Sequence, residues 1–315
     1  MGEVTARLEN ERLDLLDALI YGDVFDCAVT LDELWQYSRV AIDRDQLCRR
    51  LRTDPVLRHI IVERNGLYCL NGRTALLDQR PTRILRARRL ERRARLVARA
   101  LRHLPFVRGL VLTGSTSADD ATEGADIDLL VISAAGRIGT VFLLLGPLSR
   151  LLGRRLFCPN WYMREDRLGS AIGSLYIARE FTQARSLAGN ADALRGSNLW
   201  IAEVFPNAVA PPALRPGLKK RTILQRFLEA PLCGILGDSL ERTALRVAAA
   251  RLRVHYAAFG NDVPGQVAAS FESGAALGFH GYCYERTILK AHADRRAQLL
   301  DRLERLQAAV VSGGA

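Results

Sequence analysis

Residues 109–115 read Gly-Leu-Val-Leu-Thr-Gly-Ser, and residues 125–132 read Ala-Asp-Ile-Asp-Leu-Leu-Val-Ile. Each segment contains a run of apolar residues that is typical of a buried β-strand. Successive side chains of a strand point to opposite faces, so Asp126 and Asp128 share one face of the second strand. The apolar side chains of Ile127, Leu129 and Val131 share the other face. The stretch therefore predicts two strands that place a Gly-Ser turn beside two carboxylates.

The residue types in this stretch suit a nucleotide and a divalent metal ion. Two adjacent carboxylates repel each other unless a cation lies between them. Proteins hold Mg²⁺ with one or two carboxylates and substrate phosphates. Gly114 lets the backbone approach a phosphate closely, and Ser115 can donate from its hydroxyl at a predicted helix start. The sequence thus favours Mg²⁺ (or Mn²⁺) at Asp126 and Asp128, beside a nucleotide site at Thr113, Gly114 and Ser115.

This combination resembles the signature of the DNA-polymerase-β-like nucleotidyltransferase superfamily: an apolar strand, Gly-Ser, about ten residues, and Asp-x-Asp at a second strand. The resemblance covers about 25 residues in its specific part. It implies an α+β fold with a mixed sheet, in which Gly114 and Ser115 hold the triphosphate of the donor. It also implies that Asp126 and Asp128 are the catalytic, metal-binding residues. A chance βαβ-like unit with a polar turn is the alternative, and it does not explain both motifs at this spacing.

Two departures from the superfamily pattern concern the rest of the site. Active members usually have a third acidic residue on a later strand, but the next predicted strand, residues 155–163, contains no carboxylate. The additional candidates are Asn160 within it, Glu165 and Asp166 just after it, and Glu180 on the following helix. Many relatives also carry a basic residue after Gly-Ser, whereas residues 116–123 are acidic. The candidates for a phosphate-neutralising cation are therefore Arg108, Arg137 and Arg164.

Length and composition limit the class of protein. The 315 residues suggest two or three domains, and 49% hydrophobic with 25% charged residues is ordinary for a globular protein. The net charge of +11 favours a polyanionic partner such as nucleic acid, a nucleotide or an acidic protein. The six cysteines form no CxxC pair and have apolar neighbours, which predicts buried free thiols in a reducing compartment.

The sequence also bears on localisation. The longest uncharged stretch, the twelve residues between Arg137 and Arg150, is too short to span a bilayer and predicts a buried helix behind the sheet. Charged residues interrupt the N-terminus before any apolar run, so no signal-peptide pattern is visible. We therefore expect a cytoplasmic protein without membrane contact.

Residues 1–78 are predicted to form a winged-helix-like module. Thr30 and Asp43 each begin a capping-box pattern that opens a helix, and a first helical stripe precedes them. Asn65-Gly66 lies at the turn of a predicted hairpin. The third helix carries Arg44, Arg49, Arg50 and Arg52. These arginines could contact DNA, or the module could serve packing or dimerisation with its arginines solvated.

The remaining chain divides into three predicted parts. Residues 79–104 form a basic connecting helix with nine arginines from Arg83 to Arg102; its polar face either follows a phosphate backbone or is merely solvated. Residues 105–205 form the nucleotidyltransferase core. Residues 206–315 form a proline-rich linker (206–220) and a helical C-terminal region, with helices at 221–260 and 284–311. The isolated His255 and His280 are interpreted as structural.

The predicted function is transfer of a nucleoside monophosphate from a nucleoside triphosphate, with ATP among the candidate donors, to a small-molecule or protein acceptor. Pyrophosphate is released, and Mg²⁺ bridges the phosphates. Nucleic acid is a further candidate partner, through the winged helix and the basic helix. The alternative is a winged-helix DNA-binding or regulatory protein whose nucleotidyltransferase fold senses a nucleotide or is catalytically inactive.

Overall fold

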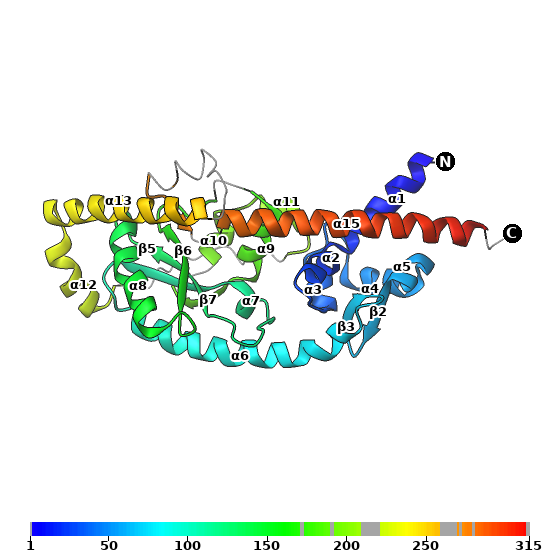
Figure 1. The fold of residues 1–315 in the computed structure, drawn as a ribbon, viewed down its shortest axis with the longest axis horizontal. Coiled ribbons are helices and arrows are strands. Elements are labelled where there is room, and N and C mark those ends of the chain that lie inside the picture. Colours follow the sequence, from blue (N-terminus) through cyan, green and yellow to red (C-terminus); the bar gives the residue numbers. More distant parts are fainter. Residues whose placement is uncertain are drawn as a thin grey trace. The chain divides into compact units, whose positions relative to one another are not determined.

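The computed structural model (Figure 1) describes residues 2–170, 173–189, 192–208, 221–258, 270, 273–278 and 281–312. The chain divides into two compact units. Unit 1 comprises residues 1–82, 200–210 and 286–315, and unit 2 comprises residues 83–199 and 211–285. The predicted C-terminal region, 206–315, therefore contributes to both units. Most of the predicted linker, residues 209–220, and His280 lie outside the described residues.

Unit 1 contains the predicted helices and hairpin. Its elements are α1 (Gly2–Leu15), α2 (Asp17–Val24), β1 (Val29–Thr30), α3 (Leu31–Gln36), α4 (Arg44–Thr53), α5 (Pro55–Ile60), β2 (Ile61–Arg64), β3 (Leu67–Leu70) and α11 (Ile201–Val204). Thr30 caps α3 with a complete capping box, and Asp43 caps α4. The turn residues Asn65 and Gly66 have φ of 55° and 75°, which suits a type I′ hairpin. The strand β1 with its pairing to β3, the helices α5 and α11, and the division of the first helical stripe into α1 and α2 were not predicted. The winged-helix assignment stays a prediction.

The C-terminal helix α15 (Gly281–Ser312) completes the core of unit 1. Leu299 and Leu303 of α15 are buried together with the helical stripe of the N-terminal residues, which includes Leu13, Leu16 and Ile20. An amphipathic helix of this length gains most of its stability from such packing. Unit 1 therefore joins residues from the two ends of the sequence in one apolar core.

Unit 2 contains a five-stranded mixed sheet of order β7-β4-β5-β6-β8. The strands are β4 (Val107–Leu112), β5 (Asp128–Ser133), β6 (Cys158–Arg164), β7 (Arg185–Ala188) and β8 (Ala276–Gly278). Strands β5 and β6 are parallel and are connected by α8 (Ile138–Leu152), whereas the other pairs are antiparallel. The α+β class, the mixed sheet and a helix packed behind the sheet are as predicted. The prediction that this helix is buried holds for only one side of α8, because Leu144, Leu151 and Leu152 are exposed. The short edge strands β7 and β8 were not predicted.

Helices cover both faces of this sheet. On one face, α6 (Ala75–Leu101), α8 and α13 (Ile235–Ala258) share an apolar core with Ile127, Leu129 and Val131, as the alternation of β5 predicted. On the other face, α9 (Leu175–Gln183) packs through Phe181, whose ring centroid is 5.3 Å from that of Trp161. The shorter helices of unit 2 are α7 (Gly114–Ser117), α10 (Asp192–Gly196), α12 (Ile223–Glu229) and the 3₁₀ helix η1 (Ala230–Leu232).

The cysteines and the apolar helices give two further findings. Cys27, Cys69 and Cys158 are buried free thiols. Cys48 is partly exposed and Cys233 is exposed, so the prediction of a buried thiol is wrong at these two positions. Cys233 lies in the turn before α13, where its apolar neighbours Ile235 and Leu236 are exposed too. The Cys283 side chain is outside the described set. Among the described helices, none has the length and hydropathy needed to cross a membrane.

Candidate active site

The Gly-Ser turn and Asp128 lie side by side at one end of the sheet of unit 2. Strand β4 ends at Leu112, helix α7 begins at Gly114, and β5 begins at Asp128. The Thr113 N–H donates to the Asp128 carbonyl at 3.1 Å. Gly114 has φ of 67°, and a Cβ atom there would lie 2.5 Å from Asp128 Oδ2. Glycine is therefore needed at 114 both for the left-handed backbone and for the close approach of the carboxylate.

Asp126 lies two residues before β5, so the prediction that it is inside the strand is wrong. Its backbone is nevertheless tied to the turn, because the Thr116 hydroxyl donates to the Asp126 carbonyl at 3.4 Å. The Asp126 side chain is partly buried, and its charge acts on Asp128. The structure therefore places the two predicted carboxylates close enough for the charge of Asp126 to act on Asp128.

Two side chains from later elements contact the Gly114–Asp128 pair. Glu180 on α9 accepts a hydrogen bond from Gly114 N–H at 3.0 Å and another from Gln183 Nε2 at 2.9 Å. Asn160 in β6 donates from Nδ2 to Asp128 Oδ1 at 3.1 Å. Of the four additional candidates, the structure therefore brings Asn160 and Glu180 to the site.

Glu165 and Asp166 are at the opposite end of β6, and their candidacy as site carboxylates is corrected. Because β6 is parallel to β5, residues after β6 lie far from Asp128 at the start of β5. Glu165 accepts from Ala135 N–H at 3.3 Å, and Asp166 is bound by Arg164 at 2.6 Å. A strand of this length carries its ends about 20 Å apart.

The predicted phosphate-binding residues form the turn itself. Thr113 is buried and Ser115 is partly exposed. The Ser115 hydroxyl makes no hydrogen bond to another residue in the described parts of the chain, whereas the Ser117 hydroxyl donates to the Gly114 carbonyl at 2.8 Å. Ser115 is thus a partly exposed residue of the turn whose hydroxyl can be directed to a ligand.

The electrostatics of the site centre on Asp128. Burial, and after it the negative charges of Glu180 and Asp126, raise the pKa of Asp128 to about 7, while Arg154 lowers it. Burial also raises the pKa of Glu180, against the hydrogen bond from Gly114 N–H. Carboxylates whose pKa is raised by one another are stabilised in the ionised form when a cation binds between them.

The oxygen atoms here suit a magnesium or manganese ion. Asn160 Oδ1 is buried and has no hydrogen-bond partner among the described residues, although the same amide donates to Asp128. A buried oxygen without a donor, next to two carboxylates, matches the ligand preference of Mg²⁺. The described residues contain no cluster of three or more His, Cys, Asp or Glu that could hold a metal. Asp126 and Asp128, with the Asn160 amide oxygen, are the residues whose oxygen atoms could hold such an ion.

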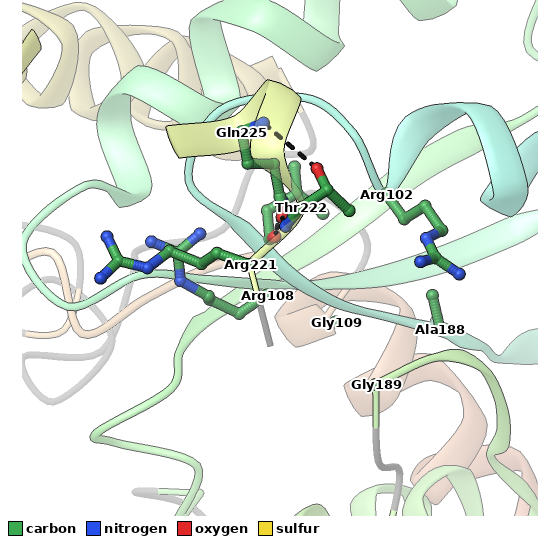
Figure 2. Close-up of a pocket in the computed structure, with 9 residues that line it drawn as sticks. Arg102, Arg108, Gly109, Ala188, Gly189, Arg221, Thr222 and Gln225 are labelled. Atoms are coloured by element: carbon green, nitrogen blue, oxygen red, sulfur yellow. Dashed lines mark hydrogen bonds between the residues drawn. The ribbon is translucent and has the colours of Figure 1, made fainter. Parts of the chain in front are cut away.

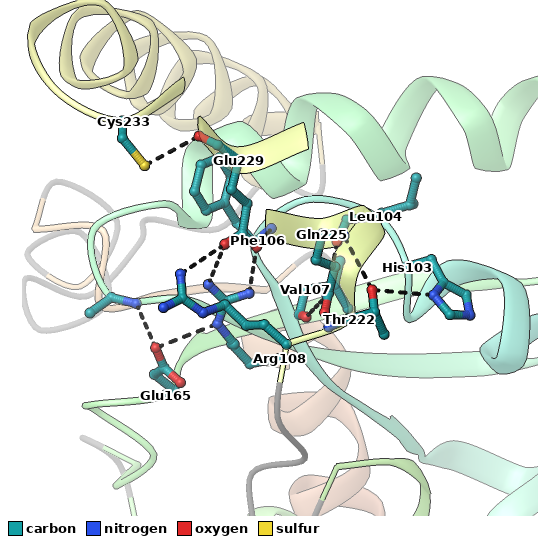
Figure 3. A network of polar contacts seen from close by, with 12 residues as sticks. His103, Leu104, Phe106, Val107, Arg108, Glu165, Thr222, Gln225, Glu229 and Cys233 are labelled. Carbon is teal, nitrogen blue, oxygen red and sulfur yellow. Dashed lines mark hydrogen bonds and ion pairs between the residues drawn. The ribbon is translucent and has the colours of Figure 1, made fainter. Parts of the chain in front are cut away.

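The three arginines that the sequence suggested as phosphate-neutralising cations do not contact the Gly114–Asp128 pair. Arg137 donates to Asp238 at 2.7 Å, and Arg164 is occupied by Asp166. Arg108 lies at the start of β4, where it donates twice to Glu229, at 2.7 and 3.1 Å (Figure 3).

Glu229 also accepts from Phe106 N–H at 2.8 Å and so holds Phe106 at its left-handed φ of 63°. The network in Figure 3 therefore fixes α12 to the turn between α6 and β4, at the end of β4 far from Gly114.

Two residues near the carboxylates were missed by sequence reasoning. Arg154, in the turn after α8, is the cation whose charge acts on both Asp126 and Asp128. Tyr284, in the first turn of α15, is about half-exposed; its pKa is raised by partial burial and then by the charges of Glu180 and Asp128. Neither residue lies in a local motif, and only the order of the strands brings them here.

Two adjacent strand ends present a glycine turn and carboxylates to one point, an arrangement that suits nucleotide phosphates and a divalent metal ion. Residues 94–158 match the model of the family described as nucleotidyltransferase domain. This segment is a nucleotidyltransferase domain of the polymerase-β-like superfamily, whose general function is nucleotidyl transfer from a nucleoside triphosphate. The match ends before Asn160 and Glu180. No curated protein and no solved structure matches the chain.

Proposed function

We propose that the chain is a Mg²⁺- or Mn²⁺-dependent nucleotidyltransferase that moves a nucleoside monophosphate from a nucleoside triphosphate, with ATP among the candidate donors, to a small-molecule or protein acceptor. Pyrophosphate is the second product. The observation that carries the proposal is the close approach of Asp128 Oδ2 to Gly114, in a turn that belongs to a nucleotidyltransferase domain.

Each residue of the site has a proposed role. Gly114 and Ser115 hold the triphosphate, the first by close backbone approach and the second through its hydroxyl. Asp126 and Asp128 hold the metal, and Asn160 adds its amide oxygen. A bound metal ion would neutralise the negative charge that develops on the phosphates during transfer. Arg154, beside the two aspartates, limits their mutual repulsion before the metal arrives.

A second candidate function has one specific observation in its favour. The position on β6 that faces Asp128 holds Asn160 instead of an acidic residue. A domain with fewer carboxylates could bind a nucleotide and regulate a DNA-binding module without turning the nucleotide over. Release of pyrophosphate from any nucleoside triphosphate in the presence of purified chain would exclude this candidate.

We expect one nucleoside triphosphate to raise the melting temperature of the chain only when Mg²⁺ is present. A ligand that binds the folded state stabilises it by about 2.7 kcal/mol at a hundred times its dissociation constant. Differential scanning fluorimetry with each triphosphate, with Mg²⁺ or with EDTA, measures the shift. Asp238→Asn, which removes an exposed carboxylate paired with Arg137, is the matched control and should keep the shift. A shift of equal size in EDTA would contradict the metal-dependent site.

Glu180→Gln is expected to lower the pKa of Asp128 while leaving the fold intact. Glutamine retains an acceptor for Gly114 N–H but removes the negative charge next to Asp128. The acid limb of the pH profile of Mg²⁺-dependent nucleotide binding should therefore move to lower pH. Fluorimetric titrations between about pH 5 and 9 measure the midpoint. An unchanged midpoint in a folded variant would show that Glu180 does not set the charge of Asp128.

A further inference from the structure

Four arginines of α6, and Arg102 directly after its last residue, form a stripe along one side of the helix. Arg88, Arg92, Arg95, Arg99 and Arg102 are spaced by 4, 3, 4 and 3 residues, which places them on one side of the helix. The first four are exposed and Arg102 is partly buried. With a rise of 1.5 Å per residue, this arginine stripe is about 21 Å long. It lies entirely in unit 2.

Most of the arginine stripe has no acidic partner. Arg95 pairs with Glu91 at 2.5 Å, and Glu91 also binds Arg185. The other four members, Arg88, Arg92, Arg99 and Arg102, make no hydrogen bond or ion pair to any residue in the described ranges. Rows of uncompensated guanidinium groups on a rigid helix are costly to keep together, and a polyanion relieves their repulsion.

The arginine stripe ends in a pocket. Arg102 lines this pocket together with Arg108, Arg221, Thr222, Gly109 and Gly189. Figure 2 shows Arg102 on one side and Arg108 with Arg221 on the other, with Thr222 and Gln225 between them. The guanidinium groups of Arg108 and Arg221 share Glu229, at 2.7 and 3.4 Å, and Glu165 is 3.9 Å from Arg108. Three guanidinium groups against two carboxylates leave a net positive pocket.

The pocket is held open by the fold. Gly189 has φ of 82°, and a Cβ atom there would lie 2.9 Å from the Arg108 carbonyl. Gln225 donates to the carbonyl groups of Leu104 at 3.2 Å and Val107 at 2.8 Å, which fixes α12 at its edge. The backbone around the pocket is therefore already in place before a ligand arrives, and only the side chains of Arg102 and Arg221 have to be ordered on binding.

We propose that the arginine stripe and this pocket bind the sugar-phosphate backbone of double-stranded nucleic acid, with one phosphate in the pocket near Arg102 and Arg221. The stripe is as long as about six base pairs at 3.4 Å per step. Helix α6 contains no aromatic residue, so it offers no stacking platform for the bases of a single strand. Guanidinium groups bind phosphate through paired N–H groups, and such contacts position a duplex without reading its sequence. The surface is separate from the candidate active site and does not depend on nucleotidyl transfer.

The test is fluorescence anisotropy of the full chain with labelled duplexes of about 20 base pairs, in DNA and RNA form, at about 50 mM salt. Arg99→Gln/Arg102→Gln removes two contacts at the pocket end of the stripe. It should weaken binding about tenfold or more and reduce the slope of log K against log salt by about 1.8, or 0.9 per lost phosphate contact. Arg221→Gln should weaken binding in the same direction.

The matched control is Arg89→Gln/Arg93→Gln, which removes the same charge from another side of α6. This pair should change the affinity by less than about threefold, and every variant should keep the wild-type melting temperature. If the two double variants lost the same amount of duplex affinity, the binding would depend only on the total charge of the helix, and the proposal would be overturned. The proposal would also be overturned if the wild type failed to bind either duplex at low salt. It would be overturned too if Arg221→Gln lost binding of inorganic phosphate but kept its affinity for the duplex.

Discussion

Asp128→Asn is expected to lower nucleotidyl transfer by about 10²- to 10³-fold or more, the loss seen when one preorganised charge-stabilising group is removed from an active site. The asparagine keeps the size of the side chain and can still accept from Asn160 Nδ2, but it cannot neutralise a divalent metal. Pyrophosphate release with a saturating donor measures the effect. Asp238→Asn serves again as the matched control, because its carboxylate is exposed and remote from Gly114.

The same variant is expected to be more stable than the wild type at alkaline pH. The pKa of Asp128 is about 7 in the folded chain against a reference value of 3.8, so the unfolded chain gives up this proton at lower pH. Unfolding of the metal-free wild type therefore becomes easier as pH rises from about 4 to about 7, and the deficit is constant above that. A difference of about three pKa units sets an upper limit of about 4 kcal/mol on the gain in Asp128→Asn.

Urea unfolding at about pH 5 and pH 8, with and without Mg²⁺, measures this gain. The stability difference between variant and wild type should be clearly smaller at the lower pH than at the higher, because ionisation of Asp128 in the unfolded chain begins near pH 4. Addition of Mg²⁺ at pH 8 should stabilise the wild type and leave the variant unchanged, because metal favours the ionised Asp128. A variant less stable than the wild type at both pH values would contradict the raised pKa of Asp128.

Gly114→Ala is expected to abolish metal-dependent nucleotide binding and transfer and to destabilise unit 2. The new Cβ atom would lie 2.5 Å from Asp128 Oδ2, so either the carboxylate or the turn has to move. A non-glycine residue at φ of 67° adds a cost of about 1–3 kcal/mol on its own. The displaced turn also loses the hydrogen bond from Gly114 N–H to Glu180.

Gly136→Ala separates the free-energy cost of the left-handed backbone from the cost of the contact between the new Cβ atom and Asp128. Gly136 has almost the same φ, 66°, but a Cβ atom there meets nothing within 4 Å. It should therefore show the backbone cost alone and keep full nucleotide binding and transfer. Chemical denaturation and pyrophosphate release, measured on both variants, give the comparison. Equal stability and activity in the two variants would show that the contact between Gly114 and Asp128 does not shape the site.

Local sequence determined the elements and the centre of the candidate site. The helix caps at Thr30 and Asp43 and the turn at Asn65-Gly66 are formed by neighbouring residues, so the sequence predicts them directly. The Gly-Ser turn and the first strands of the sheet belong to one contiguous motif, and the family match covers that motif. The roles of Asp126 and Asp128 in metal binding stay predictions from the same motif.

Only the tertiary structure decided which later residues reach this centre. Glu180 is 66 residues from Gly114, and Asn160 is 32 residues from Asp128, so no local pattern could choose them over Glu165 and Asp166. The choice follows from the parallel pairing of β5 and β6 and from the packing of α9. Edge strands β7 and β8, of four and three residues, were missed because such short segments carry no periodicity. Motifs are local in sequence, whereas pairing of distant strands and burial of charge are properties of the folded chain.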